Sequence, residues 1–141
     1  MDLNTYLERL SKAVEEGTSN AVKETASVLE DENKRLSPVD IGTLKNSIYT
    51  NLDRPSFLAE VKSSAPYTRY VLYGTGIYNT LGNGRSTGWY YNVLNPSSRY
   101  YGWHYTRGQR PNYFPQQAYN NQKNNIDKII KSEISKAISN M

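Results

Sequence analysis

Few residues of this 141-residue chain have the types and spacing that enzyme chemistry requires. General acid–base catalysis needs a positioned histidine or paired carboxylates, and a zinc site needs three or four protein ligands. The chain has one histidine, His104, and no cysteine, and its most distinctive short motif contains one carboxylate, Asp40. We therefore predict no catalytic residues, no metal ligands and no cofactor, with His104 packed or hydrogen-bonded beside Trp103 and Tyr105.

A glycine-rich triplet, Gly74-Thr75-Gly76, is a further candidate because glycine loops can bind phosphate groups. A phosphate-binding loop ends in Lys followed by Ser or Thr and comes after a strand, and neither feature is found here. The triplet instead predicts the C-terminal end of a short helix over 66–73. Asp40 and Gly42 also have a structural interpretation, in which Asp40 caps a turn and Gly42 permits a positive φ angle.

Tyrosine and arginine are the residues whose distribution points to a function. The chain has 13 Tyr against 2 Phe and 2 Trp, and no acidic residue occurs between Glu60 and Asp127. Tyr, Trp and Arg are the residue types that contribute most at protein interfaces. The segment from Arg85 to Tyr113 is therefore predicted to be an interface, with these candidate contact residues: Arg85, Trp89, Arg99, Trp103, Arg107, Arg110 and Tyr113.

Two other interpretations of this segment stay open. It could be an ordinary Tyr-rich loop that lies over a sheet. It could also be a basic face toward DNA, because Arg and Lys neutralise phosphates without reading sequence. The interface interpretation is favoured, because Tyr, Trp and Arg occur together in this segment and are the residue types enriched at interfaces.

The elements that must position these residues form an α+β pattern. A length of 141 residues predicts one domain over 1–141. Apolar residues recur at helical spacing over 1–36 and again over 115–141, with Asp2 as N-cap and Ser37-Pro38 as the end of the first helix. The segment Gly17–Asn20 is a predicted weak spot that could kink that helix. Residues 37–114 should hold the sheet and loops.

The predicted sheet is small and antiparallel. Residues 47–51 and 57–63 should pair around the turn signal at Asp53–Ser56, and two further strands, at Trp89–Tyr91 and Trp103–Thr106, should extend the same sheet after a long loop insertion. The C-terminal helix is expected to pack on this sheet.

Three patterns, in order, make the chain resemble the tail-completion (head–tail joining) protein family of long-tailed phages. Residues 37–48 look like that family's Pro-Val-Asp-Thr-Gly-x-Leu-Arg-x-Ser-Ile signature, with Ile41 in place of Thr. Residues 65–75 resemble Tyr-Ala-x-Tyr-Val-Glu-Tyr-Gly-Thr, with Leu72 in place of Glu, so any ion pair of that Glu is missing. Residues 110–118 resemble Pro-x-x-Phe-x-x-x-Ala. The matching positions, taken as structural, are Pro38, Asp40, Gly42, Leu44, Tyr67, Tyr70, Gly74, Thr75, Pro111, Phe114 and Ala118.

The resemblance implies a structural virion protein at the neck of the particle. Such a subunit forms a ring, often a hexamer, that joins the head connector to the tail, and its partners are itself, connector proteins and tail proteins. Contact with DNA in the lumen would be non-specific. The protein would be made in the cytoplasm of the bacterial host, which agrees with the lack of cysteine, of a secretory signal and of a membrane span.

Three rival functions remain. The first is a nucleic-acid-binding module, because an acid-free segment with interleaved Tyr can hold single strands by stacking. The second is a hydrolase acting on cell wall or nucleic acid, which the residue inventory disfavours. A carbohydrate-binding role for the Tyr and Trp side chains is a weaker third.

Overall fold

The computed structural model describes residues 1–38 and 42–141, and it divides into two compact units. The helical unit consists of Met1–Ala65 and Phe114–Met141, and the aromatic unit consists of Pro66–Tyr113. The helical unit holds α1 (Leu3–Leu36), α2 (Gly42–Ser47), β1 (Ile48–Asp53), β2 (Leu58–Ser63) and α4 (Phe114–Ser139). The aromatic unit holds α3 (Thr68–Tyr73), the 3-10 turn η1 (Gly76–Tyr78), β3 (Trp89–Val93) and β4 (Gly102–Thr106). This α+β architecture confirms the predicted fold class.

The long first helix begins and ends where the sequence predicts. The side chain of Asp2 accepts a hydrogen bond of 2.7 Å from the backbone N–H of Thr5. At the other end Ser37 is extended, and its N–H donates to the carbonyl of Asn33 at 2.9 Å. Pro38 disfavours helical geometry at Ser37, which explains the stop.

The prediction of a weak spot at Gly17–Asn20 was wrong, because α1 is helical without interruption from Leu3 to Leu36. Gly17 is buried, and a Cβ built on it would lie 2.8 Å from the Cα of Ile134 and 3.2 Å from the Cβ of Ala137. The glycine therefore allows the backbones of α1 and α4 to approach closely at this position.

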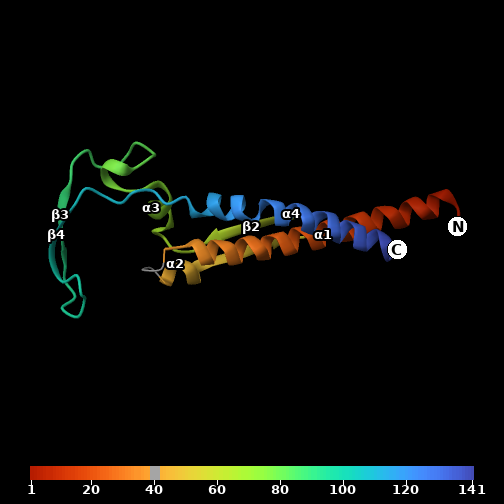
Figure 1. The fold of residues 1–141 in the computed structure, drawn as a ribbon, viewed down its shortest axis with the longest axis horizontal. Coiled ribbons are helices and arrows are strands. Elements are labelled where there is room, and N and C mark those ends of the chain that lie inside the picture. Colours follow the sequence, from red (N-terminus) through yellow and green to blue (C-terminus); the bar gives the residue numbers. More distant parts are fainter. Residues whose placement is uncertain (39–41) are drawn as a thin grey trace. The chain divides into compact units, whose positions relative to one another are not determined.

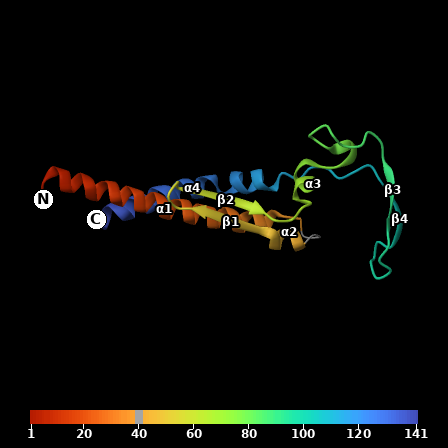
Figure 2. The same cartoon turned by 180° about the vertical axis from the view of Figure 1, so that it is seen from behind.

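The main contact of α4 is with α1, which corrects the expectation that α4 packs on the sheet. The two helices run antiparallel, and both Figure 1 and Figure 2 show them side by side, with the first turns of α1 extending past the C-terminal end of α4. Small side chains on α1 allow the close approach. The buried apolar residues of the helical unit are Ala13, Ala21, Ala26, Leu44, Ile48, Phe114, Ala118, Ile126 and Ile129.

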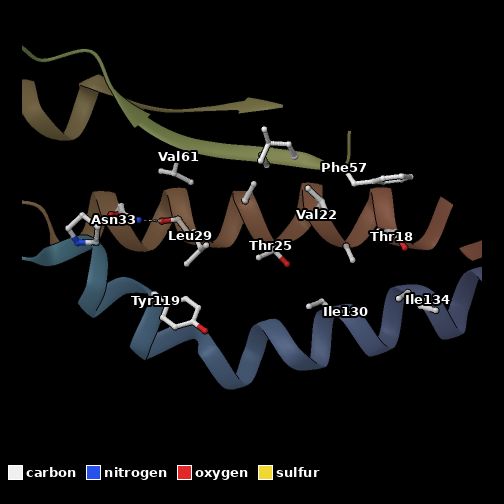
Figure 3. Close-up of a pocket in the computed structure, with 15 residues that line it drawn as sticks. Thr18, Val22, Thr25, Leu29, Asn33, Phe57, Val61, Tyr119, Ile130 and Ile134 are labelled. Carbon is white, nitrogen blue, oxygen red and sulfur yellow. Dashed lines mark hydrogen bonds between the residues drawn. The ribbon is translucent and has the colours of Figure 1, made fainter. Parts of the chain in front are cut away.

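The first hairpin packs on α1 and agrees with the prediction. β1 and β2 are antiparallel, with Ile48 opposite Ser63 and Asp53 opposite Leu58. The hydroxyl of Ser47, the last residue of α2, lies 2.8 Å from the hydroxyl of Ser63. In Figure 3 α1 runs between β2 and α4, so this helix is the centre of the helical unit.

A buried carboxylate ties α1 to α4. Glu32 accepts hydrogen bonds from Arg35 of its own helix and, at 3.2 Å each, from the side-chain amides of Asn121 and Gln122 on α4. The hydrogen bonds from Arg35 and Asn121 are the main causes that lower the pKa of Glu32 to about 2, and burial opposes them. The ionised carboxylate is thus the form that the folded chain prefers.

This carboxylate gives a prediction for stability in acid. Because the pKa of Glu32 is lowered on folding from an ordinary value of 4.5, its contribution is complete above that value and is lost as the pH falls toward 2. Glu32→Ala should lower the melting temperature at pH 7, and the gap to the unsubstituted chain should close as the pH falls from about 5 to about 2. Glu8→Ala controls for loss of a glutamate from the same helix. A gap of constant size across this pH range would contradict the assignment.

The aromatic unit corrects the prediction that all four strands form one sheet. β3 and β4 pair only with each other, antiparallel, from Trp89 opposite Thr106 to Val93 opposite Gly102. They are close in the sequence, and pairing them closes a short loop at low entropic cost. Val71 is the one buried apolar side chain described in this unit. That the 141 residues form a single domain remains a prediction, which a single cooperative unfolding transition would support.

Candidate interaction surface

Backbone hydrogen bonds hold the aromatic unit together where side chains provide little core. The segment after α3 pairs with the segment after β4: Thr75 N–H donates to the carbonyl of Gln109 at 2.9 Å, and Ile77 N–H donates to that of Arg107 at 3.1 Å. Asn112 N–H donates to the carbonyl of Val71 at 2.9 Å. These hydrogen bonds fix the 3-10 turn to the segment that leads from β4 to residue 113. The two segments position the side chains described below.

Gly74 ends α3 as predicted and also brings two of the sequence patterns together. It has a φ of 79°, which favours glycine, and its N–H donates to the carbonyl of Tyr70 at 2.9 Å. A Cβ on Gly74 would lie 2.9 Å from the carbonyl oxygen of Gln109 and 3.0 Å from Cδ of Pro111. A larger residue would therefore separate the second pattern from the third.

The β3–β4 hairpin presents aromatic side chains on both faces. Tyr90, Tyr105 and Trp103 share one face and are 71%, 57% and 71% exposed, and the rings of Tyr90 and Tyr105 have centroids 5.1 Å apart. On the other face Tyr91 stacks on His104 at 5.4 Å. His104 Nε2 also lies 2.5 Å from the carbonyl of Tyr100, so the one histidine is engaged in packing and hydrogen bonding.

The aromatic unit contains arginines but no carboxylate that could neutralise their charge. Arg85 lies over the ring of Trp89 at 4.6 Å, Arg99 over Tyr100 at 5.0 Å and Arg110 over Tyr78 at 4.7 Å. In the described ranges, no salt bridge joins Arg69, Arg85, Arg99, Arg107 or Arg110 to an acidic residue. The ring contacts fix the guanidinium groups in position while leaving them exposed.

The structure places all seven candidate contact residues in the aromatic unit. Trp89 is half-buried beneath Arg85, and the other six are exposed. A hollow of about 600 Å³ adds Arg69 and Tyr73, which the sequence analysis did not single out, and Tyr70, which it took as structural, because all three line it together with Arg85 and Trp89. Arg69 belongs to the acid-free stretch of the sequence, which was the available signal for it.

A second concave feature, in the helical unit, is apolar. It is a groove of about 490 Å³ between α1, β2 and α4, lined mainly by side chains such as Val22, Phe57 and Ile134 (Figure 3). Among the residues that the structure describes, no carboxylate, histidine or lysine lines it. Of its polar groups, Asn33 donates to the carbonyl of Leu29 at 2.7 Å, whereas the hydroxyl of Thr25 is buried without a partner among the described residues. The groove can therefore bind apolar groups but offers no acid–base chemistry.

Several residues of the sequence patterns lie in the core of the helical unit. Leu44 and Ala118 are fully buried and Phe114 is 2% exposed, while Pro38 is half-buried and Gly42 begins α2. Asp40 lies outside the described residues. In the aromatic unit Tyr67 precedes α3 and is half-buried, whereas Tyr70 is 54% exposed.

No three His, Asp or Glu side chains within 1–38 and 42–141 come together as metal ligands would. No helix in these ranges is both long enough and apolar enough to cross a membrane.

Comparison with known proteins gave a match to a protein family. The family model described as "Bacteriophage HK97-gp10, putative tail-component" matches residues 1–74. These residues make up more than half of the chain and run from α1 to the end of α3, so they include the first sequence pattern and all but the last residue of the second. No curated protein and no solved structure matched.

Proposed function

We propose a function from the family to which this chain belongs, the HK97-gp10-like bacteriophage tail components. The family match confirms the resemblance drawn from the three patterns, and the chain is accordingly a structural phage tail component that contacts other virion proteins, and not an enzyme. Within that role, the proposed position is the neck of the particle. There the subunit forms a ring that joins the head connector to the tail.

The composition of the aromatic unit is the observation that supports this position. Its exposed Tyr, Trp and Arg side chains are of the types that bind partners most strongly, and they surround a hairpin of two strands. An isolated two-stranded hairpin is only marginally stable in water. A partner that covers the hairpin would both stabilise it and remove the exposed rings from water. In this proposal the candidate contact residues, Arg85 to Tyr113, are the part of the subunit that meets its neighbours.

Reversal of two charges tests the interface. Arg107→Glu with Arg110→Glu should leave the monomer folded, because both side chains are exposed. Losing two interface arginines should weaken docking on the order of 100-fold, so unattached heads and tails should accumulate. Electron micrographs of lysates and counts of infectious particles measure this. Lys128→Glu with Lys131→Glu on exposed positions of α4 makes the same change in net charge and is the control. Normal numbers of joined particles from the arginine variant would contradict the proposal.

A nucleic-acid-binding role is a second candidate, because the aromatic unit carries five arginines, no acidic residue and exposed aromatic rings. Binding to single-stranded DNA at micromolar concentration, weakening steeply with added salt, would favour it. Contact with the DNA that passes through the ring would be the weaker form of the same property.

A further inference from the structure

The two units of the chain carry charges that are separated to an unusual degree. The aromatic unit has five arginines and no acidic residue, so every Asp and Glu of the chain belongs to the helical unit. Within α1, the stretch from Glu15 to Glu32 contains six acidic residues and one basic residue, Lys23. The same chain thus presents one surface that requires anions and one that requires cations.

The internal ion pairs leave most of the outer face of α1 uncompensated. Glu30 is 3.9 Å from Lys34, and Glu32 is held by Arg35. Over the residues that the structure describes, no salt bridge reaches Glu15, Glu16 or Asp31, and all three are exposed. Lys12 and Arg54 lie beside Glu15 and Glu16, but among the described residues none of the three carboxylates is engaged in a salt bridge, so each can accept an arginine from another chain.

Glu24 adds to the excess of negative charge. Glu133 on α4 is its acidic neighbour, and the interaction between the two carboxyl groups raises the pKa of Glu24, which the positive charge of Lys136 partly opposes. Two acidic groups so close repel each other when both are ionised. An arginine brought near this pair would relieve the repulsion.

A hollow beside two of the carboxylates has the shape and chemistry to receive an arginine with its aromatic neighbour. It measures about 550 Å³ and is lined by Glu15, Glu16 and Phe57 together with Lys12, Ser19, Arg54 and Pro55. Phe57 is 41% exposed and has a φ of 52°, a rare conformation for a side chain of this size. A guanidinium that pairs with a carboxylate here can also stack on the ring of Phe57.

From this complementarity we propose that arginines of the aromatic unit, Arg107 and Arg110 among them, dock on the Glu15–Glu16 face of α1 in a second copy of the chain. The inference rests on the proposed function, because it identifies the two surfaces that would meet within the ring. The surfaces differ, so the contact is head-to-tail and can close into a ring. A symmetrical contact between two aromatic units would instead bring five arginines against five arginines.

A charge swap between two variants tests the proposal. Variant one carries Glu15→Arg and Glu16→Arg, and variant two carries Arg107→Glu and Arg110→Glu. In each variant the α1 face and the substituted part of the aromatic unit carry charges of the same sign, so neither variant should assemble alone. The number of joined particles should fall at least tenfold when either variant is the sole copy. In a mixture, the basic residues introduced into α1 of variant one meet the two carboxylates introduced at positions 107 and 110 of variant two, and the unchanged faces of the two variants also match. Co-expression should therefore restore joined particles, as should one chain with all four changes.

The outcomes separate this inference from the proposed function. If variant one joins heads to tails normally while variant two fails, the second-copy contact is wrong and the neck interface stands. If both fail and neither co-expression nor the combined chain restores joining, the arginines bind another virion protein and the inference is again overturned. If both variants join heads to tails normally, the proposed interface itself is wrong. Circular dichroism melts of each variant check folding, and Glu15→Gln with Glu16→Gln replaces variant one if that chain does not fold.

Discussion

Replacing the buried Gly17 with valine is expected to lower the melting temperature by about 10 °C. The reason is geometric. A Cβ at this position would lie 2.8 Å from the Cα of Ile134 and 3.1 Å from the carbonyl oxygen of Glu133, and both are backbone atoms of α4. Side-chain rotation cannot relieve such contacts, so the helices must move apart and lose packing along their length. A cost of about 3 kcal/mol in unfolding free energy is the upper end of what overpacking usually causes.

A smaller substitution, Gly17→Ala, tests the same close approach through the sign of its effect on stability. Glycine in the middle of a helix is normally less stable than alanine by about 0.5–1 kcal/mol, so Gly→Ala usually stabilises a helix. Gly17→Ala should instead destabilise this chain, because even one methyl group meets α4. Ser11→Ala, at an exposed position of the same helix, should be neutral or slightly stabilising and is the matched control. A Gly17→Ala variant that melts higher than the unsubstituted chain would show that the helices do not approach so closely.

Gly17 also shows where sequence reasoning about the fold stops. Local signals placed the ends of α1 correctly, since a capping Asp2 and the Ser37-Pro38 pair act within a few residues. The same local view read Gly17 as a helix breaker. Its real role depends on Ile134 and Ala137, which are far away in the sequence and whose position no local pattern specifies.

The strands show the same difference between what neighbouring residues specify and what distant residues specify. Each predicted strand exists, and the β1–β2 hairpin follows from its turn signal at Asp53–Ser56. The partner of β3 could not be derived in the same way. Alternation of apolar and polar residues shows that a segment is extended, but it does not show which other strand the segment pairs with. The nearest extended segment, β4, is the partner, and the result is two small sheets in place of one.

The residue types of the interaction surface could be predicted from the sequence, but the arrangement of these residues in space could not. A stretch without acidic residues, rich in Tyr and Arg, identified the aromatic unit from composition alone. The stacking of Arg110 on Tyr78 joins residues from different segments of that unit. So does the hollow that brings Arg69 to Arg85. Neither the apolar groove in Figure 3 nor the carboxylates beside Phe57 could be recognised before the folded arrangement was known.

Two adjacent residues provide the second large effect, and they separate folding from assembly. Phe114 begins α4 and is 2% exposed, whereas Tyr113 is 47% exposed and belongs to the candidate interface. Phe114→Ala should cost about 3–5 kcal/mol of unfolding free energy, because it removes a buried ring and leaves a cavity. Tyr113→Ala should change the unfolding free energy by less than about 0.5 kcal/mol, as exposed substitutions usually do.

The two variants should behave in opposite ways when tail joining is measured. Tyr113→Ala should melt normally yet give fewer joined particles, since the ring is lost from the contact surface and not from the core. Phe114→Leu, which refills most of the cavity, should recover much of the stability lost in Phe114→Ala and should also recover joining. Urea unfolding and electron microscopy of the same preparations measure the two properties together. If Tyr113→Ala were as destabilising as Phe114→Ala, Tyr113 would be a packing residue, and the boundary drawn between core and interface at this point in the chain would be wrong.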